Sequence, residues 1–162
     1  MYGVGPVRYA LDVEKGGVGM LSAREKLLVE GQYDWVKLWD AHRHVAFENV
    51  SDPLAEVQRK TLALVAALIR DGLAEPGDLR EHGAHFEPWT SELAESIERL
   101  SADYIDKFAD RAGWPWTLWL RITDEGKRIG ATHEADYRRW SEALHEQGAD
   151  EQALPLKFEP GA

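Results

Sequence analysis

The chain has 162 residues, of which 44% are hydrophobic and 30% charged, and it carries a net charge of −10 at pH 7. This length suits one domain whose core folds without a metal or a disulfide, and the lack of cysteine excludes disulfides, thiolate metal sites and a thiol nucleophile. Because the longest apolar run, 62–69, is too short for a membrane span and the first residues lack the apolar core of a secretory signal, we expect a cytoplasmic protein.

The first 20 residues differ from the rest in composition. Residues 1–19 hold five of the 14 glycines and show no clear periodicity. We interpret residues 1–20 as a flexible N-terminal arm. An alternative is that translation begins at Met20, in which case the arm is not native.

Three helices are predicted in the next fifty residues. Ser22 and Glu25 have the spacing of a capping box, which predicts a short helix that Gly31 ends. Apolar residues at helical spacing predict a second helix over 34–47. The clearest periodicity begins near Pro53 and predicts a third helix, with Gly72 as its natural end.

The second half of the chain mixes helical and extended patterns. The segment LAEPGDL, 73–79, has the composition of a turn, and HFEPW, 85–89, is short and partly extended. Residues 91–112 predict a long helix with an apolar inner face and an acidic outer face. TLWLRIT reads as a strand, DEGKRIG as one or two helical turns, and 132–147 as a final helix before a loose tail at 149–162.

Two of these segments together resemble a winged-helix domain of bacterial regulators. LALVAALIRDGLAEPGDL is followed later by LWLRITDEGKRIG, and the resemblance covers 34–130. Gly72 would end the recognition helix in a left-handed cap, and Thr123 would cap the helix after the returning strand. The resemblance implies a mostly helical α+β domain over 21–148. It would have a winged-helix-like core with a small antiparallel sheet, an inserted acidic helix and a C-terminal helix. Homodimerisation is implied only by the same resemblance.

The resemblance also implies a DNA-binding regulator, which we keep as an alternative. Its base and phosphate contacts would come from Gln58, Arg59, Lys60, Thr61, Arg121, Lys127 and Arg128. These side chains equally suit the solvated turns of amphipathic helices, and the net charge disfavours a nucleic-acid partner. In addition, about 28 residues with an acidic helix separate Trp89 from Leu118, where a winged-helix protein has a short hairpin loop.

The acidic segment favours a protein partner instead. We predict a non-catalytic protein-binding module that neutralises or scaffolds a basic partner, in the manner of an immunity protein or an inhibitor. Tryptophan is enriched at binding hot spots. The predicted contact residues are Glu95, Glu98, Asp103, Asp106, Trp114 and Trp116. The alternative interpretation is an ordinary solvated helix face with tryptophans packed in the core.

Small-molecule and catalytic functions find less support in the sequence. Trp89, Trp114, Trp116 and Trp119 fall close together and could line a small-molecule pocket, which is our third hypothesis. No serine lies in a nucleophile turn, and the histidines lack the spacing of a metal site. We therefore expect neither an enzyme nor a bound metal or cofactor.

Overall fold

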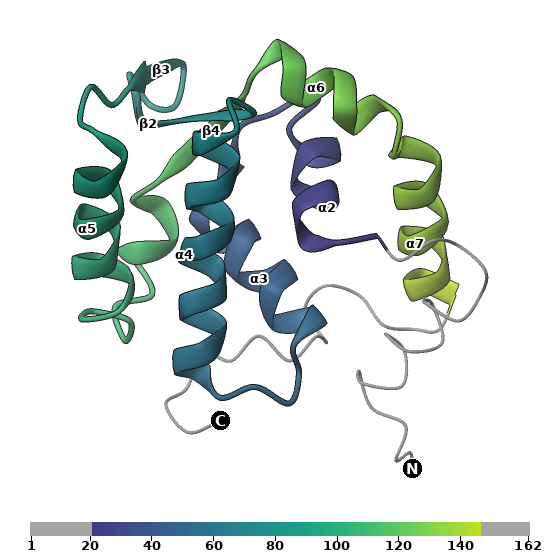
Figure 1. Cartoon of the computed structure of the whole chain (residues 1–162), viewed down its shortest axis with the longest axis horizontal. Helices are drawn as coiled ribbons and strands as arrows, with labels where there is room; N and C mark the ends of the chain where they lie inside the picture. Colours follow the sequence, from purple (N-terminus) through teal and green to yellow (C-terminus); the bar gives the residue numbers. More distant parts are fainter. Residues whose placement is uncertain (1–20, 147–162) are drawn as a thin grey trace.

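The computed structural model describes residues 21–146, in which the fold is α+β and mostly helical (Figure 1). Six α-helices, one 3-10 helix and a four-stranded antiparallel sheet occur in this part of the chain. The predicted N-terminal arm and C-terminal tail lie outside the described residues. Within them, no helix has the length and apolarity that crossing a membrane requires.

The first helix, α2 (Ala23–Glu30), begins and ends as the sequence predicts. The Ser22 hydroxyl accepts a hydrogen bond from the Glu25 backbone N–H at 3.1 Å, and the Glu25 carboxylate accepts from the Ser22 N–H at 3.0 Å. Each side chain thus satisfies a backbone donor that the first turn leaves free. Gly31 follows at the C-cap, packed so closely on Ile122 that a Cβ would lie 2.0 Å from a side-chain carbon.

The second predicted helix starts later than expected. Residues Val36–Lys37 form a short strand, β1, and helix α3 spans Leu38–Glu48. The prediction of helix from residue 34 was wrong because Val36 and Lys37 pair with another strand, which periodicity within one segment cannot reveal. Helix α4 (Leu54–Arg70) follows, and Gly72 takes a left-handed φ of 75° after it, as predicted.

The sheet has the order β1-β4-β2-β3, with every neighbouring pair antiparallel. Its other strands are β2 (Ala74–Arg80), β3 (His85–Pro88) and β4 (Trp119–Ile122). The extended segments at β3 and β4 were predicted, whereas β2 was predicted to be a turn. Partners on both sides of β2 override the turn preference of Pro76 and Gly77, and a Cβ at Gly77 would lie 2.5 Å from the Glu87 carbonyl oxygen.

The long segment between β3 and β4 contains helix α5 (Leu93–Tyr104) and the 3-10 turn η1 (Trp114–Trp116). The predicted helix to residue 112 is therefore too long. After Tyr104 the chain turns, so that Phe108 and Trp114 both enter the core. Figure 1 shows α5 beside α4 at one end of the molecule.

The chain ends in two helices, α6 (Asp124–Ala131) and α7 (Glu134–Glu146), close to the predicted positions. Helix α6 packs on α2, and α7 contacts α2 at the opposite end of the molecule from α5 (Figure 1). One main core joins the sheet to α2, α3, α4 and the segment between β3 and β4. That segment therefore packs as part of the same fold.

Candidate protein-interaction surface

Helix α5 is amphipathic, and its outer side is acidic. Ser96, Leu100 and Tyr104 are buried on the inner side, while Glu95 and Glu98 project from the outer side and are exposed. These positions are three or four residues apart within each set, so each set lies along one face of the helix. The hydroxyls of Ser91 and Ser96 are hydrogen-bonded at 2.8 Å, which ties the residues before α5 to its first turns.

The only basic residue within α5, Arg99, turns away from the outer side. Its guanidinium lies 4.0 Å from the ring centroid of Trp89 and 3.5 Å from an Asp78 carboxylate oxygen. Among the ion pairs of the described residues, none involves the carboxylate of Glu95 or of Glu98.

The two remaining predicted carboxylates lie at the C-terminal end of α5. Asp103 is only partly exposed: an oxygen lies 3.8 Å from the Lys107 ammonium, and the residue borders a cavity of about 150 Å³ next to Trp89 and Arg99. Asp106, just beyond the helix, is exposed. Three of the four predicted carboxylates thus face solvent freely, and Asp103 contributes partly to this surface.

The structure removes Trp114 from the predicted contact surface. Its side chain is 1% exposed, and its indole N–H donates to the Phe108 carbonyl at 2.9 Å. The ring stacks on Phe108, with centroids 5.0 Å apart and planes at 16°, and packs against His42 and Tyr104. Trp114 is a core residue because the turn after α5 folds it inward, which its predicted loop position did not indicate.

Trp116, two residues later, is 53% exposed. Its ring lies 6.2 Å from that of Trp119, and the Lys37 ammonium lies 5.7 Å from both ring centroids. Ile105, at the end of α5, is 44% exposed. We call the surface formed by five exposed residues and the partly exposed Asp103 the α5–η1 surface; it consists of Glu95, Glu98, Asp103, Ile105, Asp106 and Trp116. Ile105 was not among the predicted contacts, because its helical spacing assigned it to the inner face.

The residues predicted as DNA contacts on α4 divide into buried and exposed ones. Gln58 and Thr61 are buried: the Gln58 amide donates to the Tyr104 carbonyl at 3.1 Å, and the Thr61 hydroxyl donates to the Val57 carbonyl at 2.7 Å. Helix α5 covers the side of α4 that carries them. The prediction of Gln58 and Thr61 as base contacts is therefore corrected, since neither side chain reaches the surface.

The predicted cationic contacts are mostly engaged within the protein. Arg59 pairs with Glu56 at 2.5 Å, and its hydrogen bond lowers the pKa of that carboxyl below the ordinary value. Lys60 lies 2.7 Å from Asp52. Surface pairs of this kind are weak and could exchange for phosphate, but in this structure a carboxylate neutralises each of the two cations.

The other predicted cations lie on β4 and α6. Arg121 pairs with Glu75 at 2.9 Å, and Arg128 with Glu125 at 2.5 Å. In contrast, the described residues place no carboxylate within ion-pair distance of the Lys127 ammonium. Lys127 is thus chemically distinct from the rest of this group.

The predicted tryptophan cluster does not converge on one pocket. Trp89 faces Arg99, Trp114 lies in the core, and Trp116 packs beside Trp119. Of two cavities in the described part of the chain, the one of about 400 Å³ is lined by Trp35 and the one of about 150 Å³ by Trp89, so neither of these two is lined by all four rings of the third hypothesis. Across 21–146, no group of three or more histidine, aspartate or glutamate residues is arranged to hold a metal ion.

A partly buried polar cluster between α2, α3 and α7 was not predicted from the sequence. One oxygen of the Glu30 carboxylate accepts from the Tyr137 hydroxyl at 2.6 Å and lies 2.9 Å from His44 Nε2. Burial opposes the charge on Glu30, but His44, Tyr137 and Arg43 together lower its pKa. No local pattern signals this cluster, because Glu30 and Tyr137 are 107 residues apart.

Comparison with known proteins yields no relative: no family model, no curated protein and no solved structure matches this chain. A function cannot be transferred from a homologue. The chemistry of the described side chains is the basis for a proposed function.

Proposed function

We propose that this protein is a non-catalytic binding module that neutralises or scaffolds a basic protein through the α5–η1 surface. The observation that carries the proposal is the position of the exposed large apolar side chains. Three of them are exposed in the described part of the chain, Tyr33, Ile105 and Trp116, and the last two belong to α5 and to η1, which are in contact. An exposed tryptophan and an acidic helix face on neighbouring elements are typical of a protein contact.

Charge and apolar side chains would have separate roles in this contact. Residues 92–106 hold five carboxylates and one guanidinium, and that guanidinium turns toward Trp89. The negative field would speed encounter with a basic partner and disfavour an acidic one, while Trp116 and Ile105 would supply apolar burial. The anchoring of α5 on α4 through Gln58 and Tyr104 supports the role of a rigid recognition element.

We also propose that the core is winged-helix-like, with the wing replaced by the segment between β3 and β4. Supporting this are the order β1-β4-β2, the helix α4 directly before β2, and β4 leading into a capped helix. DNA binding remains the alternative function for such a core. It is less favoured because α5 covers part of α4 and because carboxylates pair with Arg59 and Lys60.

The test compares matched variants against the captured partner. The tagged protein would first retrieve a basic protein from an extract of its own cells, and the purified partner would then be titrated. We expect Glu95→Lys with Glu98→Lys to weaken binding at least about tenfold, and Trp116→Ala to weaken it similarly. The control is Glu142→Lys, a charge reversal at an exposed position of α7, which should leave binding unchanged.

Two results would count against this function. One is normal binding of the partner by the double variant once thermal unfolding shows that it is folded. The other is wild-type binding to a random-sequence DNA duplex that is lost in Arg59→Ala with Lys60→Ala and falls steeply with salt. The second result would establish the regulator instead.

A further inference from the structure

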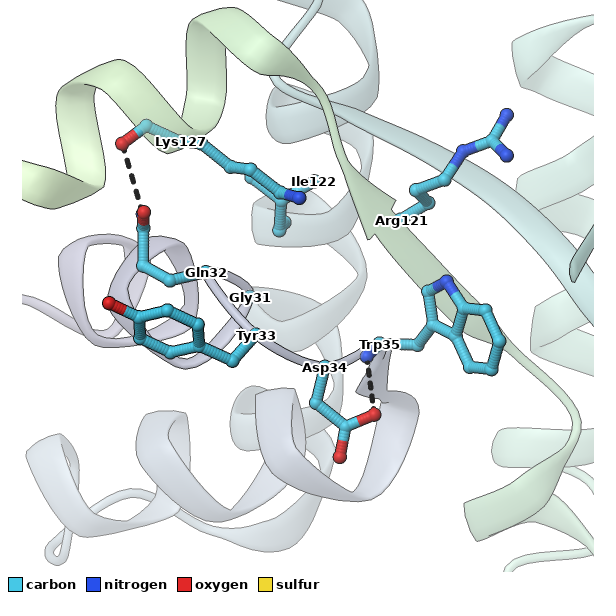
Figure 2. A pocket seen from close by; sticks show the side chains of 8 residues that line it. All are labelled: Gly31, Gln32, Tyr33, Asp34, Trp35, Arg121, Ile122 and Lys127. Atoms are coloured by element: carbon cyan, nitrogen blue, oxygen red, sulfur yellow. Dashed lines mark hydrogen bonds between the residues drawn. The ribbon is translucent and has the colours of Figure 1, made fainter. Parts of the chain in front are cut away.

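The third exposed aromatic residue, Tyr33, borders a pocket far from the α5–η1 surface. The pocket has a volume of about 400 Å³ and lies between the loop after α2, strand β4 and helix α6 (Figure 2). Its lining residues are Gly31, Gln32, Tyr33, Asp34, Trp35, Arg121, Ile122 and Lys127. This volume is in the range of small-molecule sites.

The backbone around the pocket is fixed by hydrogen bonds. The Gln32 side-chain amide donates to the carbonyls of Leu28 at 2.9 Å and Lys127 at 3.0 Å, which ties the loop to both helices. On the opposite side, the Asp34 carboxylate accepts from the Trp35 backbone N–H at 2.8 Å (Figure 2). The loop backbone on this side of the pocket is therefore held in place before a ligand binds, which reduces the entropic cost of binding.

One cation is available to a ligand in this pocket. Figure 2 shows the Lys127 side chain extending from α6 past Ile122, and no carboxylate of the described residues pairs with its ammonium. Arg121, the other cation, is already held by Glu75 at 2.9 Å and lies 4.6 Å from the Phe86 ring centroid. The pocket thus offers one ammonium group with free hydrogen-bond donors.

Two aromatic residues line the same pocket as this ammonium. Trp35 stacks on Phe86, with ring centroids 6.1 Å apart, so its indole is held in place. Tyr33 is 88% exposed, and its ring stands at the other side of the pocket in Figure 2. Aromatic faces bury flat apolar groups well, and an exposed ring gains most from being covered.

We propose that this pocket binds a small monoanionic carboxylate with a flat apolar body. The carboxylate would accept hydrogen bonds from the Lys127 ammonium, and the apolar body would pack between Trp35 and Tyr33. A more highly charged ligand, such as a polyphosphate, is disfavoured because Asp34 lines the same pocket and Glu75 already neutralises Arg121. This site is separate from the proposed protein contact and goes beyond it.

Titration of the full chain with benzoate, followed by two-dimensional NMR, tests the proposal. The Gln32 side-chain amide and the Trp35 indole N–H are the reporters. For so small a probe a dissociation constant on the order of 1 mM is expected. Benzamide, which has the same shape without the charge, should bind at least about tenfold more weakly, and indole-3-carboxylate should bind several-fold more tightly because its ring is larger.

The matched variants are Lys127→Met and Arg128→Met, which remove adjacent charges from one helix. Lys127→Met keeps the aliphatic stem and should weaken benzoate binding at least about tenfold, whereas Arg128→Met should change it less than about twofold. The proposal is overturned if the two reporters do not shift up to about 10 mM benzoate. It is equally overturned if benzamide binds as well as benzoate, or if Lys127→Met binds benzoate like the wild type.

Discussion

The Thr123 hydroxyl donates a hydrogen bond to the Gly72 carbonyl at 2.8 Å and accepts one from the Gly126 N–H at 3.1 Å. One side chain thus caps α6 and ties it to the turn after α4, although 51 residues separate Thr123 from Gly72. The Thr123 N–H also donates to the Leu73 carbonyl at 3.0 Å. These bonds lie at the end of the sheet where β2 begins and β4 ends.

Replacing Thr123 by valine tests this junction, because valine keeps the shape and removes the hydroxyl. The variant loses the N-cap of α6 and the bond to Gly72, so the free energy of unfolding should fall by about 1–2 kcal/mol. Thr123→Ser is the control and should remain within about 0.5 kcal/mol of the wild type. Urea unfolding measures both values, and equal stability of the valine and serine variants would contradict the role.

The junction also illustrates what the sequence could predict. Caps at Ser22, Gly72 and Thr123 follow local rules and were all predicted, as were most helices and the strand β4. Strands β1 and β2 were missed or taken for a turn, because their pairing partners are distant in sequence. Local propensity around Pro76 and Gly77 points the wrong way until both neighbouring strands are in place.

For the candidate surfaces, the sequence indicated which residue types are present, but not which of their side chains face solvent and which face the core. The acidic face of α5 follows from helical spacing, and Glu95 and Glu98 are exposed as expected. Trp114 and Trp116 lie two residues apart in one turn, yet one is buried and the other exposed. Only the path of the chain after Tyr104 decides this. The pocket at Lys127 has no sequence signature, since its walls come from three separate segments.

The two tryptophans of η1 should respond oppositely to truncation. Trp114→Leu removes a stacked, fully buried ring and its bond to the Phe108 carbonyl, so stability should fall by about 3 kcal/mol or more. Trp116→Ala removes an exposed ring and should cost less than about 1 kcal/mol. Thermal and urea unfolding distinguish the two variants. Similar losses in both would show that Trp116 is part of the core and would remove it from the α5–η1 surface.

His42 and Tyr104 join α3 to α5 inside the core. The phenol oxygen lies 2.5 Å from His42 Nδ1, and burial raises the pKa of Tyr104 well above its ordinary value. Tyr104→Phe should therefore lower the free energy of unfolding by about 1–2 kcal/mol at neutral pH. Tyr33→Phe, an equivalent change on an exposed ring, should have almost no effect on stability.

The raised pKa gives this pair a second, pH-dependent consequence. Because the native state disfavours the phenolate, the contribution of Tyr104 is complete below the unfolded pKa of about 10 and is lost as the pH rises through the folded value. Wild-type stability should thus decline in alkali more steeply than that of Tyr104→Phe. Identical alkaline slopes in urea unfolding would show that the phenol ionises as readily in the native protein as in the unfolded chain.

Glu30 should make stability depend on pH in the opposite sense, at acid pH. Although burial disfavours its charge, His44, Tyr137 and Arg43 together hold the pKa of Glu30 below the ordinary 4.5. Its contribution is therefore complete above that value and is lost as the pH falls through the lower, folded pKa. Between about pH 6 and about pH 3, wild type should lose this increment of stability, whereas Glu30→Gln should lack it already at pH 6.

The Glu30 variant also tests how α7 is held on the protein. The ring of Trp140 in α7 lies 5.9 Å from that of His44, and the Lys26 ammonium lies 4.2 Å from the Trp140 ring centroid. Because Tyr137 bonds Glu30 directly, loss of the carboxylate should loosen α7 before the rest of the core. Hydrogen exchange should then show faster exchange in α7 of Glu30→Gln, with α4 unchanged. Uniform acceleration across both helices would instead mean that Glu30 stabilises the whole domain and does not specifically fasten α7.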